Sequence, residues 1–168
     1  MDDPALPAEL TKTGDLYLRG YDHALPSGLT TTGNLYGLGD YDHALPEGLA
    51  TTGALYLRGY DHALPAGLMT TGGLYGLDDY HHALPAGLTT TGDLDLSDYD
   101  HALPAGLTKT GDLDLEGYDH ALPEGLTTTG ALYLRGYGHE LPSGLTTTGR
   151  LYGLRSYDHA LPAGLKGF

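Results

Sequence analysis

The sequence predicts an all-β protein, a parallel β-solenoid of about eight coils of 19–20 residues. A Leu-Pro pair recurs every 19 or 20 residues, and a fixed period near 20 residues is typical of stacked repeats. Leu alternates with Tyr or Asp in each unit, which is the period of a strand, and Gly and Pro are too frequent for helices. The repeats begin at Leu6, Leu25, Leu45, Leu64, Leu84, Leu103, Leu122 and Leu141. Residues 1–168 therefore form a single solenoid domain, with a C-terminal stub at 161–168.

The first straight segment of each unit follows an invariant Gly and reads Leu-x-Leu, as in Leu94-Asp95-Leu96. We expect a strand with Leu pointing inward and the middle residue, Tyr or Asp, pointing outward. Three units carry one additional residue in this segment, and it is Gly each time: Gly37, Gly76 and Gly153. A single inserted Gly predicts a β-bulge that keeps both flanking Leu side chains inward.

The second straight segment carries three Thr columns, as in Thr30-Thr31-Thr32 between two glycines. Thr favours strands, and the bounding glycines indicate bends. Lys12 and Lys109 stand in the middle column, which indicates that this column faces water. The third column is Thr in every unit, so we expect its side chain to pack inward or to bond an amide of the bend.

The third segment reads Tyr-Asp-His-Ala-Leu-Pro and predicts an extended corner, since the residue before Pro avoids helical geometry. Its Tyr never changes, which favours a partly buried aromatic ladder with the phenol reaching polar atoms. The Tyr column comprises Tyr21, Tyr41, Tyr60, Tyr80, Tyr99, Tyr118, Tyr137 and Tyr157. The His column comprises His23, His43, His62, His82, His101, His120, His139 and His159, with His81 beside it. We interpret the His residues mainly as structural corner residues, with incidental metal binding as the alternative.

The composition excludes several functions. The chain has no Cys, which removes disulfides, thiol catalysis and zinc–thiolate sites. Its formal net charge of −14 disfavours binding to nucleic acid and to anionic membranes. No apolar run of 18 residues predicts a transmembrane helix, and the start at Met1–Pro4 is not a secretory signal. The localisation is left open. No Ser or Cys nucleophile recurs beside the His column, so we expect no enzyme and no cofactor.

Exposed tyrosines are the first candidate for a binding surface, because aromatic stripes are common at recognition surfaces. An alternative is a cross-strand ladder that only stiffens the sheet. These outward positions are Tyr17, Tyr36, Tyr56, Tyr75, Tyr133 and Tyr152. A weak metal candidate is the carboxylate cluster expected on two adjacent coils, which suits Ca²⁺ but is read mainly as a solvated acidic face. Its members are Asp93, Asp95, Asp112 and Asp114.

The leading functional hypothesis is a non-enzymatic structural scaffold or protein-interaction module. An ice-binding solenoid is the second, because regularly spaced Thr hydroxyls and methyls on a flat face can order water. That face would comprise Thr30, Thr31, Thr51, Thr70, Thr89, Thr90, Thr127, Thr128, Thr146 and Thr147. An acidic mimic of nucleic acid is the third. Matching strands at both ends also predict end-to-end self-association, opposed by the net charge and by Asp2, Asp3, Pro4 and Phe168 as guards.

The frame Leu-Pro-x-Gly-Leu-x-x-x-Gly-x-Leu-x-Leu, from Leu6 to Leu165, resembles tandem repeats found in many bacterial and phage proteins. It is also distantly similar to the Leu-Pro-containing leucine-rich repeats of bacterial effectors, which would imply an arc as the alternative fold. Those repeats place Asn after Leu-x-Leu-x-x, whereas this chain has Tyr there, for example Tyr99, which favours a straighter solenoid. The resemblance implies binding or scaffolding. The near-identity of the units indicates recent duplication or consensus design.

Overall fold

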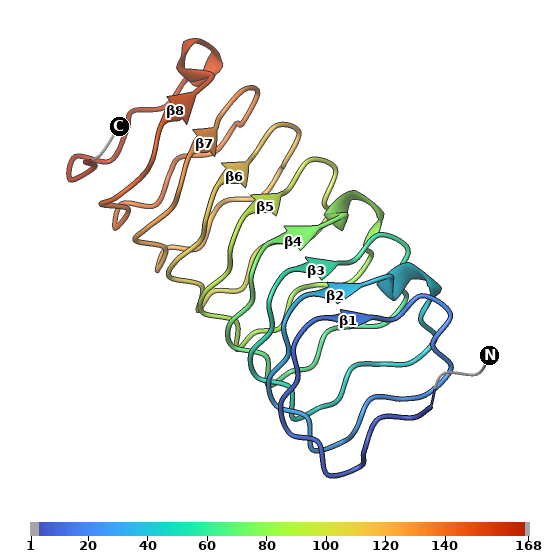
Figure 1. Ribbon diagram of the computed structural model, residues 1–168. Helices are drawn as coiled ribbons and strands as arrows, with labels where there is room; N and C mark the ends of the chain where they lie inside the picture. The colour runs from blue at the N-terminus through green and yellow to red at the C-terminus, as the bar shows by residue number, and fades with distance from the viewer. Residues whose placement is uncertain (1–3, 167–168) are drawn as a thin grey trace.

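The protein is a stack of similar coils, each contributing one short strand to a single parallel sheet (Figure 1). This computed structural model describes residues 4–166. Within it the eight strands pair in sequence order, so each coil lies between its neighbours in the chain. The strands are β1 (Leu16–Tyr17), β2 (Leu35–Tyr36), β3 (Leu55–Tyr56), β4 (Leu74–Tyr75), β5 (Leu94–Asp95), β6 (Leu113–Asp114), β7 (Leu132–Tyr133) and β8 (Leu151–Tyr152). The predicted β-solenoid is confirmed.

The core is a set of Leu columns that run the length of the stack. Parallel pairing aligns equivalent leucines, with Leu55 opposite Leu74 and Leu94 opposite Leu113. One coil buries five apolar side chains, namely Leu84, Leu88, Leu94, Leu96 and Tyr99. Burial of this kind is the main stabilising contribution, and no coil can achieve it without a neighbour above and below. The predicted strand polarity, with Leu inward, is confirmed.

The Thr segment is straight but forms no strand. Each coil contributes one isolated parallel bridge there, such as Thr51 with Thr70. The third Thr column is buried from Thr32 to Thr148, as expected. From Thr32 to Thr129 each hydroxyl donates to the carbonyl of the following glycine, as from Thr32 Oγ1 to the Gly33 oxygen at 3.0 Å, whereas the buried Thr148 hydroxyl has no such partner among the described residues. The side chain therefore packs inward, as expected, but its hydrogen-bond partner is a carbonyl of the bend and not an amide.

The glycine after the Thr columns is required by close stacking of the coils. A Cβ placed on Gly92 would lie 2.6 Å from the amide nitrogen of Gly73 in the preceding coil. The glycine of the Leu-Pro-x-Gly corner is under less constraint, because a Cβ on Gly106 would meet its nearest atom, the Ala86 oxygen, at 3.6 Å. The two glycines of the repeat therefore serve different purposes.

The inserted glycines do not lie inside strands, so the predicted β-bulge is wrong in its position. Gly37, Gly76 and Gly153 follow the second strand residue with φ of 77–80°, and each begins a short 3₁₀ turn. These turns are η1 (Leu38–Asp40), η2 (Leu77–Asp79) and η3 (Leu154–Ser156). The strands are only two residues long, so the additional residue falls in the turn that follows.

The leucines that flank two of the inserted glycines are buried, as expected: Leu35 with Leu38, and Leu74 with Leu77. The expectation is wrong for Gly153 near the end of the stack, where Leu154 is 41% exposed. The strands also remain in register across the insertion, since Leu35 pairs with Leu55. In the shorter coils the residue with a left-handed backbone conformation, such as Gly59 or Asp98, stands directly before the invariant Tyr of the corner, which we call the inner tyrosine. At Gly37 and Gly76 the insertion therefore moves the residue with positive φ to an earlier position in the turn, and the Leu columns stay buried.

Asp2, Asp3 and Phe168, the expected guards of the ends, lie outside the described residues. Within residues 4–166 no helix has the length and apolar character that crossing a membrane would require.

Candidate interaction surface

The corner segments are tied together by hydrogen bonds between successive coils. The phenol oxygen of Tyr41 donates to the His23 carbonyl at 2.9 Å and accepts the Leu25 amide at 3.1 Å. The same donation recurs from Tyr60 to His43, at 2.9 Å. This inner tyrosine column is buried, as the invariant Tyr predicted, and its polar atoms are used inside the protein.

Burial raises the pKa of the inner tyrosines from Tyr41 to Tyr157, because removal from water disfavours the phenolate. The pKa of Tyr41, Tyr80 and Tyr118 rises to about 12. The pKa of Tyr60, Tyr99 and Tyr137 is also raised by burial. These groups stay protonated at neutral pH and serve as hydrogen-bond donors.

The His side chains bridge coils in the same way. His62 Nε2 lies 2.9 Å from the Asp42 carbonyl oxygen, and since a carbonyl only accepts, the imidazole N–H donates. A bond to the equivalent backbone carbonyl of the preceding coil is made by His43, His82, His101, His120, His139 and His159. No cluster of three or more His, Asp or Glu side chains suited to a metal occurs between residues 4 and 166. The geometry agrees with structural corner residues.

The carboxylates proposed as a weak metal candidate bind backbone amides. Asp95 and Asp114 are paired across β5 and β6, as expected, and each accepts a hydrogen bond from an amide of its own turn. Asp93 accepts from the amide of Asp112, at 2.8 Å, and Asp112 accepts from that of Ala131. One oxygen of each carboxylate is therefore already occupied.

The bonds of Asp93 and Asp112 belong to a ladder of Asp and Asn side chains that sequence reasoning missed. The Asp15 carboxylate accepts a hydrogen bond from the backbone N–H of Asn34 at 2.8 Å. The side-chain oxygen of Asn34 accepts one from the backbone N–H of Ala54 at 2.8 Å. The available signal was the recurrence of Asp or Asn directly after the invariant glycine. Each of these side chains bonds the next coil at the residue that directly precedes the strand, beside the outward column.

The Thr columns proposed as an ice-binding face are partly used inside the protein. First-column hydroxyls donate to a backbone carbonyl one coil earlier, such as Thr30 Oγ1 to the Thr11 oxygen at 3.1 Å. Thr89, Thr108, Thr127 and Thr146 make the same bond. Middle-column residues form the isolated bridges; Thr31, Thr51, Thr70, Thr90 and Thr128 are half-buried, and Thr147 is exposed. Ice binding through these columns stays a prediction.

The outward tyrosines form a stacked ladder on β1–β4. Ring centroids are 4.8 Å apart for Tyr17 and Tyr36, 4.9 Å for Tyr36 and Tyr56, and 5.1 Å for Tyr56 and Tyr75, with interplanar angles of 10–23°. We call these four residues the tyrosine ladder. A second, shorter pair on β7 and β8 joins Tyr133 and Tyr152 at 4.6 Å and 8°. Asp95 and Asp114 separate the two sets.

The tyrosine ladder faces solvent. Tyr17 is 75% exposed, while Tyr56 and Tyr75 are close to 40% exposed because each ring covers its neighbours. Asn34 donates to the Tyr36 phenol oxygen at 3.1 Å, and the Tyr75 ring lies against Gly73, where a Cβ would meet its phenol oxygen at 2.6 Å. The rings thus lean over the residue that precedes the strand, and this fixes their tilt.

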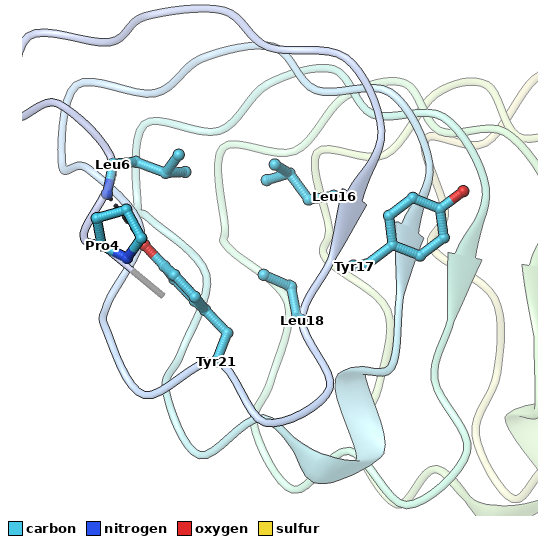
Figure 2. Close-up of a pocket in the computed structure, with 6 residues that line it drawn as sticks. All are labelled: Pro4, Leu6, Leu16, Tyr17, Leu18 and Tyr21. Atoms are coloured by element: carbon cyan, nitrogen blue, oxygen red, sulfur yellow. Dashed lines mark hydrogen bonds between the residues drawn. The ribbon is translucent and has the colours of Figure 1, made fainter. Parts of the chain in front are cut away.

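Two hollows adjoin the outward tyrosines. At the first coil, a hollow of about 240 Å³ is lined by Pro4, Leu6, Leu16, Tyr17, Leu18 and Tyr21. Figure 2 shows Leu6, Leu16, Leu18 and Tyr21 gathered on one side of β1, whereas Tyr17 points to the other side. The second hollow, of about 190 Å³, lies beside Tyr133 and Tyr152 and is also lined by Asp114, Glu116 and Arg135.

Comparison of the chain with models of protein families, with curated proteins and with solved structures found no match.

Proposed function

We propose that the protein is a non-enzymatic repeat scaffold that presents the tyrosine ladder as an interaction surface. The stacked rings of Tyr17, Tyr36, Tyr56 and Tyr75 are the observation that supports this most directly: Tyr36 is half-buried and the other three are exposed. The inward columns and the corners are used for stacking coil on coil. The outward column is free to vary, because the chain itself places Asp95 and Asp114 there.

Aromatic side chains are enriched at the energetic centres of protein interfaces, because they offer large apolar area with little rotational freedom to lose. The ladder restricts that freedom further, since Tyr36 and Tyr56 are held between two neighbouring rings and Tyr75 lies against Gly73. The bonds from Asp15 to Asn34 and from Asn34 to Ala54 hold together the residues that directly precede β1, β2 and β3, and so support a fixed shape for this surface. Both properties favour recognition of a partner over a purely internal role.

Selection of displayed random peptides against the immobilised protein tests the proposal. The variant carries Tyr36→Asp and Tyr56→Asp, substitutions for which Asp95 and Asp114 are the native precedent. Peptides that bind the native protein and lose at least about tenfold in affinity for the variant would support an interaction surface on the ladder. Enrichment of no peptide, or equal binding to both proteins, would contradict it. Unchanged far-ultraviolet circular dichroism of the variant confirms that the fold is kept.

A further inference from the structure

The stacking distances of the tyrosine ladder restrict how a ligand can meet it. Neighbouring ring centroids are 4.8–5.1 Å apart, and a planar molecule needs about 7 Å to enter between two stacked rings. The faces of Tyr36 and Tyr56 are therefore closed on both sides. A ligand that uses all four rings has to lie along the ladder, across their exposed edges.

The length of the ladder sets the size of the ligand. Four rings at the spacing of parallel strands span about 15 Å. The ladder stops at β4, because Asp95 takes the outward position of β5. The ladder suits a straight, rigid and flat molecule of this length, since such a molecule loses little conformational freedom when it binds.

The charges around the ladder select a cation. The two nearby arginines are paired with carboxylates of the next coil: Arg19 Nε lies 3.3 Å from Asp40, and an Arg58 terminal nitrogen lies 2.9 Å from Asp78. Asp15 stands beside the rings, and Asp95 stands at the end of the ladder. With a net charge of −14 on the whole chain, the surface attracts cations and repels anions.

We propose that the tyrosine ladder binds elongated planar aromatic cations, which lie along β1–β4 across the ring edges. This rests on the proposed function in that it uses the same surface. The ring faces carry the partial negative charge that attracts cations, but stacking closes them, and the exposed ring edges carry partial positive charge. Contact between the ring edges and the ligand is therefore apolar, and the acidic residues around the ladder attract the ligand's positive charge.

Thioflavin T, an elongated aromatic cation that fluoresces strongly only when its two ring systems are held near one plane, is the probe, and its fluorescence on titration with protein gives the affinity. The variant with Tyr36→Asp and Tyr56→Asp interrupts the ladder and should weaken binding at least about tenfold. The opposite variant, with Asp95→Tyr and Asp114→Tyr, joins the two sets of tyrosines into eight consecutive rungs and should strengthen binding. Raising the salt concentration should weaken binding to the native protein, because screening reduces the attraction.

Two controls locate the bound dye. Tyr17→Asp alone should weaken dye binding only modestly. Complete loss of binding with Tyr17→Asp, together with unchanged binding to the Tyr36→Asp and Tyr56→Asp variant, would place the dye in the hollow at the first coil and overturn the proposal. Congo red, a planar anion of similar shape, should bind more weakly than thioflavin T. Equal binding of both dyes, no binding to the native protein, or weaker binding to the joined ladder would each contradict the proposal. Peptides selected on the ladder without dye binding would leave the proposed function standing and refute this inference alone.

Discussion

Tyr60 donates a hydrogen bond from its phenol oxygen to the carbonyl of His43, 2.9 Å away in the preceding coil. The His43 imidazole in turn donates to the Asp22 carbonyl one coil further back. Two adjacent coils are therefore joined at the corner by the invariant Tyr and His, in addition to the strand ladder. This explains why neither column varies along the chain.

The first prediction concerns alkaline pH. Unfolded tyrosine ionises near pH 10, whereas burial raises the pKa of Tyr41, Tyr80 and Tyr118 to about 12 in the folded protein. The unfolded state therefore releases these protons first. Their contribution to stability is fully present below pH 10 and is lost as the pH rises toward 12. Urea unfolding at several pH values between about 8 and 12 should show this loss. Constant stability across that range would mean that these phenols are not held protonated by the fold.

The second prediction separates the two faces of the strand. Leu94→Ala truncates a buried side chain and should lower the free energy of unfolding by about 2–5 kcal/mol. Asp95→Ala, on the adjacent exposed position, should cost about 0.5 kcal/mol or less, as is usual at the surface. Chemical denaturation of both variants gives the comparison. Similar losses for the two would overturn the assignment of inward and outward positions.

The third prediction concerns Gly76, the inserted glycine that follows β4. Deleting Gly76 should be tolerated, because the remaining Asp79 then stands where Asp98 stands in the following coil, with the left-handed φ of 61° that Asp98 adopts. Gly76→Ala should be worse than the deletion, since φ is 80° and the Cβ would lie 2.7 Å from the Arg58 amide nitrogen. Melting temperatures of the two variants give the order, and a more stable alanine variant would refute the argument.

The fourth prediction compares the two glycine columns. Gly92→Ala should destabilise by about 1–3 kcal/mol or more, since its Cβ would enter the backbone of the preceding coil. Gly106→Ala should be tolerated, because its Cβ would lie 3.6 Å from the nearest atom. Thermal unfolding monitored by circular dichroism measures both. Equal effects would show that close stacking is not what selects glycine after the Thr columns.

The fifth prediction concerns self-association of the 168-residue chain. The net charge of −14 should keep it monomeric or in small oligomers at low salt and neutral pH. Repulsion is screened beyond about 10 Å at 0.1 M salt, and the charge vanishes near pH 4.7, so end-to-end assemblies should grow under either condition. Removing Met1–Pro4 and Lys166–Phe168 should lower the salt that is needed. Light scattering that reports monomers at every salt concentration, for intact and trimmed chains alike, would count against matching ends.

The sequence was sufficient for the solenoid, the Leu columns and the outward tyrosines, because each depends on a period that can be counted along the chain. Strand length was not predictable from the alternation, since Leu18 and Leu57 are inward without belonging to a strand. The bonds of Asp15 and Asp93 to the next coil were missed for a related reason. A side chain that bonds a residue 19 positions away is recognised only when the height and register of the stack are known.

The hydrogen bonds between coils also determine how the rod responds to a pulling force. They run from one coil to the next, as from the Leu94 amide to the Asp112 carbonyl, and within residues 4–166 each strand pairs with its neighbours in the stack. A force applied along the stack loads these layers in series, so coils should peel away one after another. Each release converts a rise of about 4.8 Å into about 65 Å of extended chain for a 19-residue unit. The protein would therefore lengthen in even steps and absorb work at each of them.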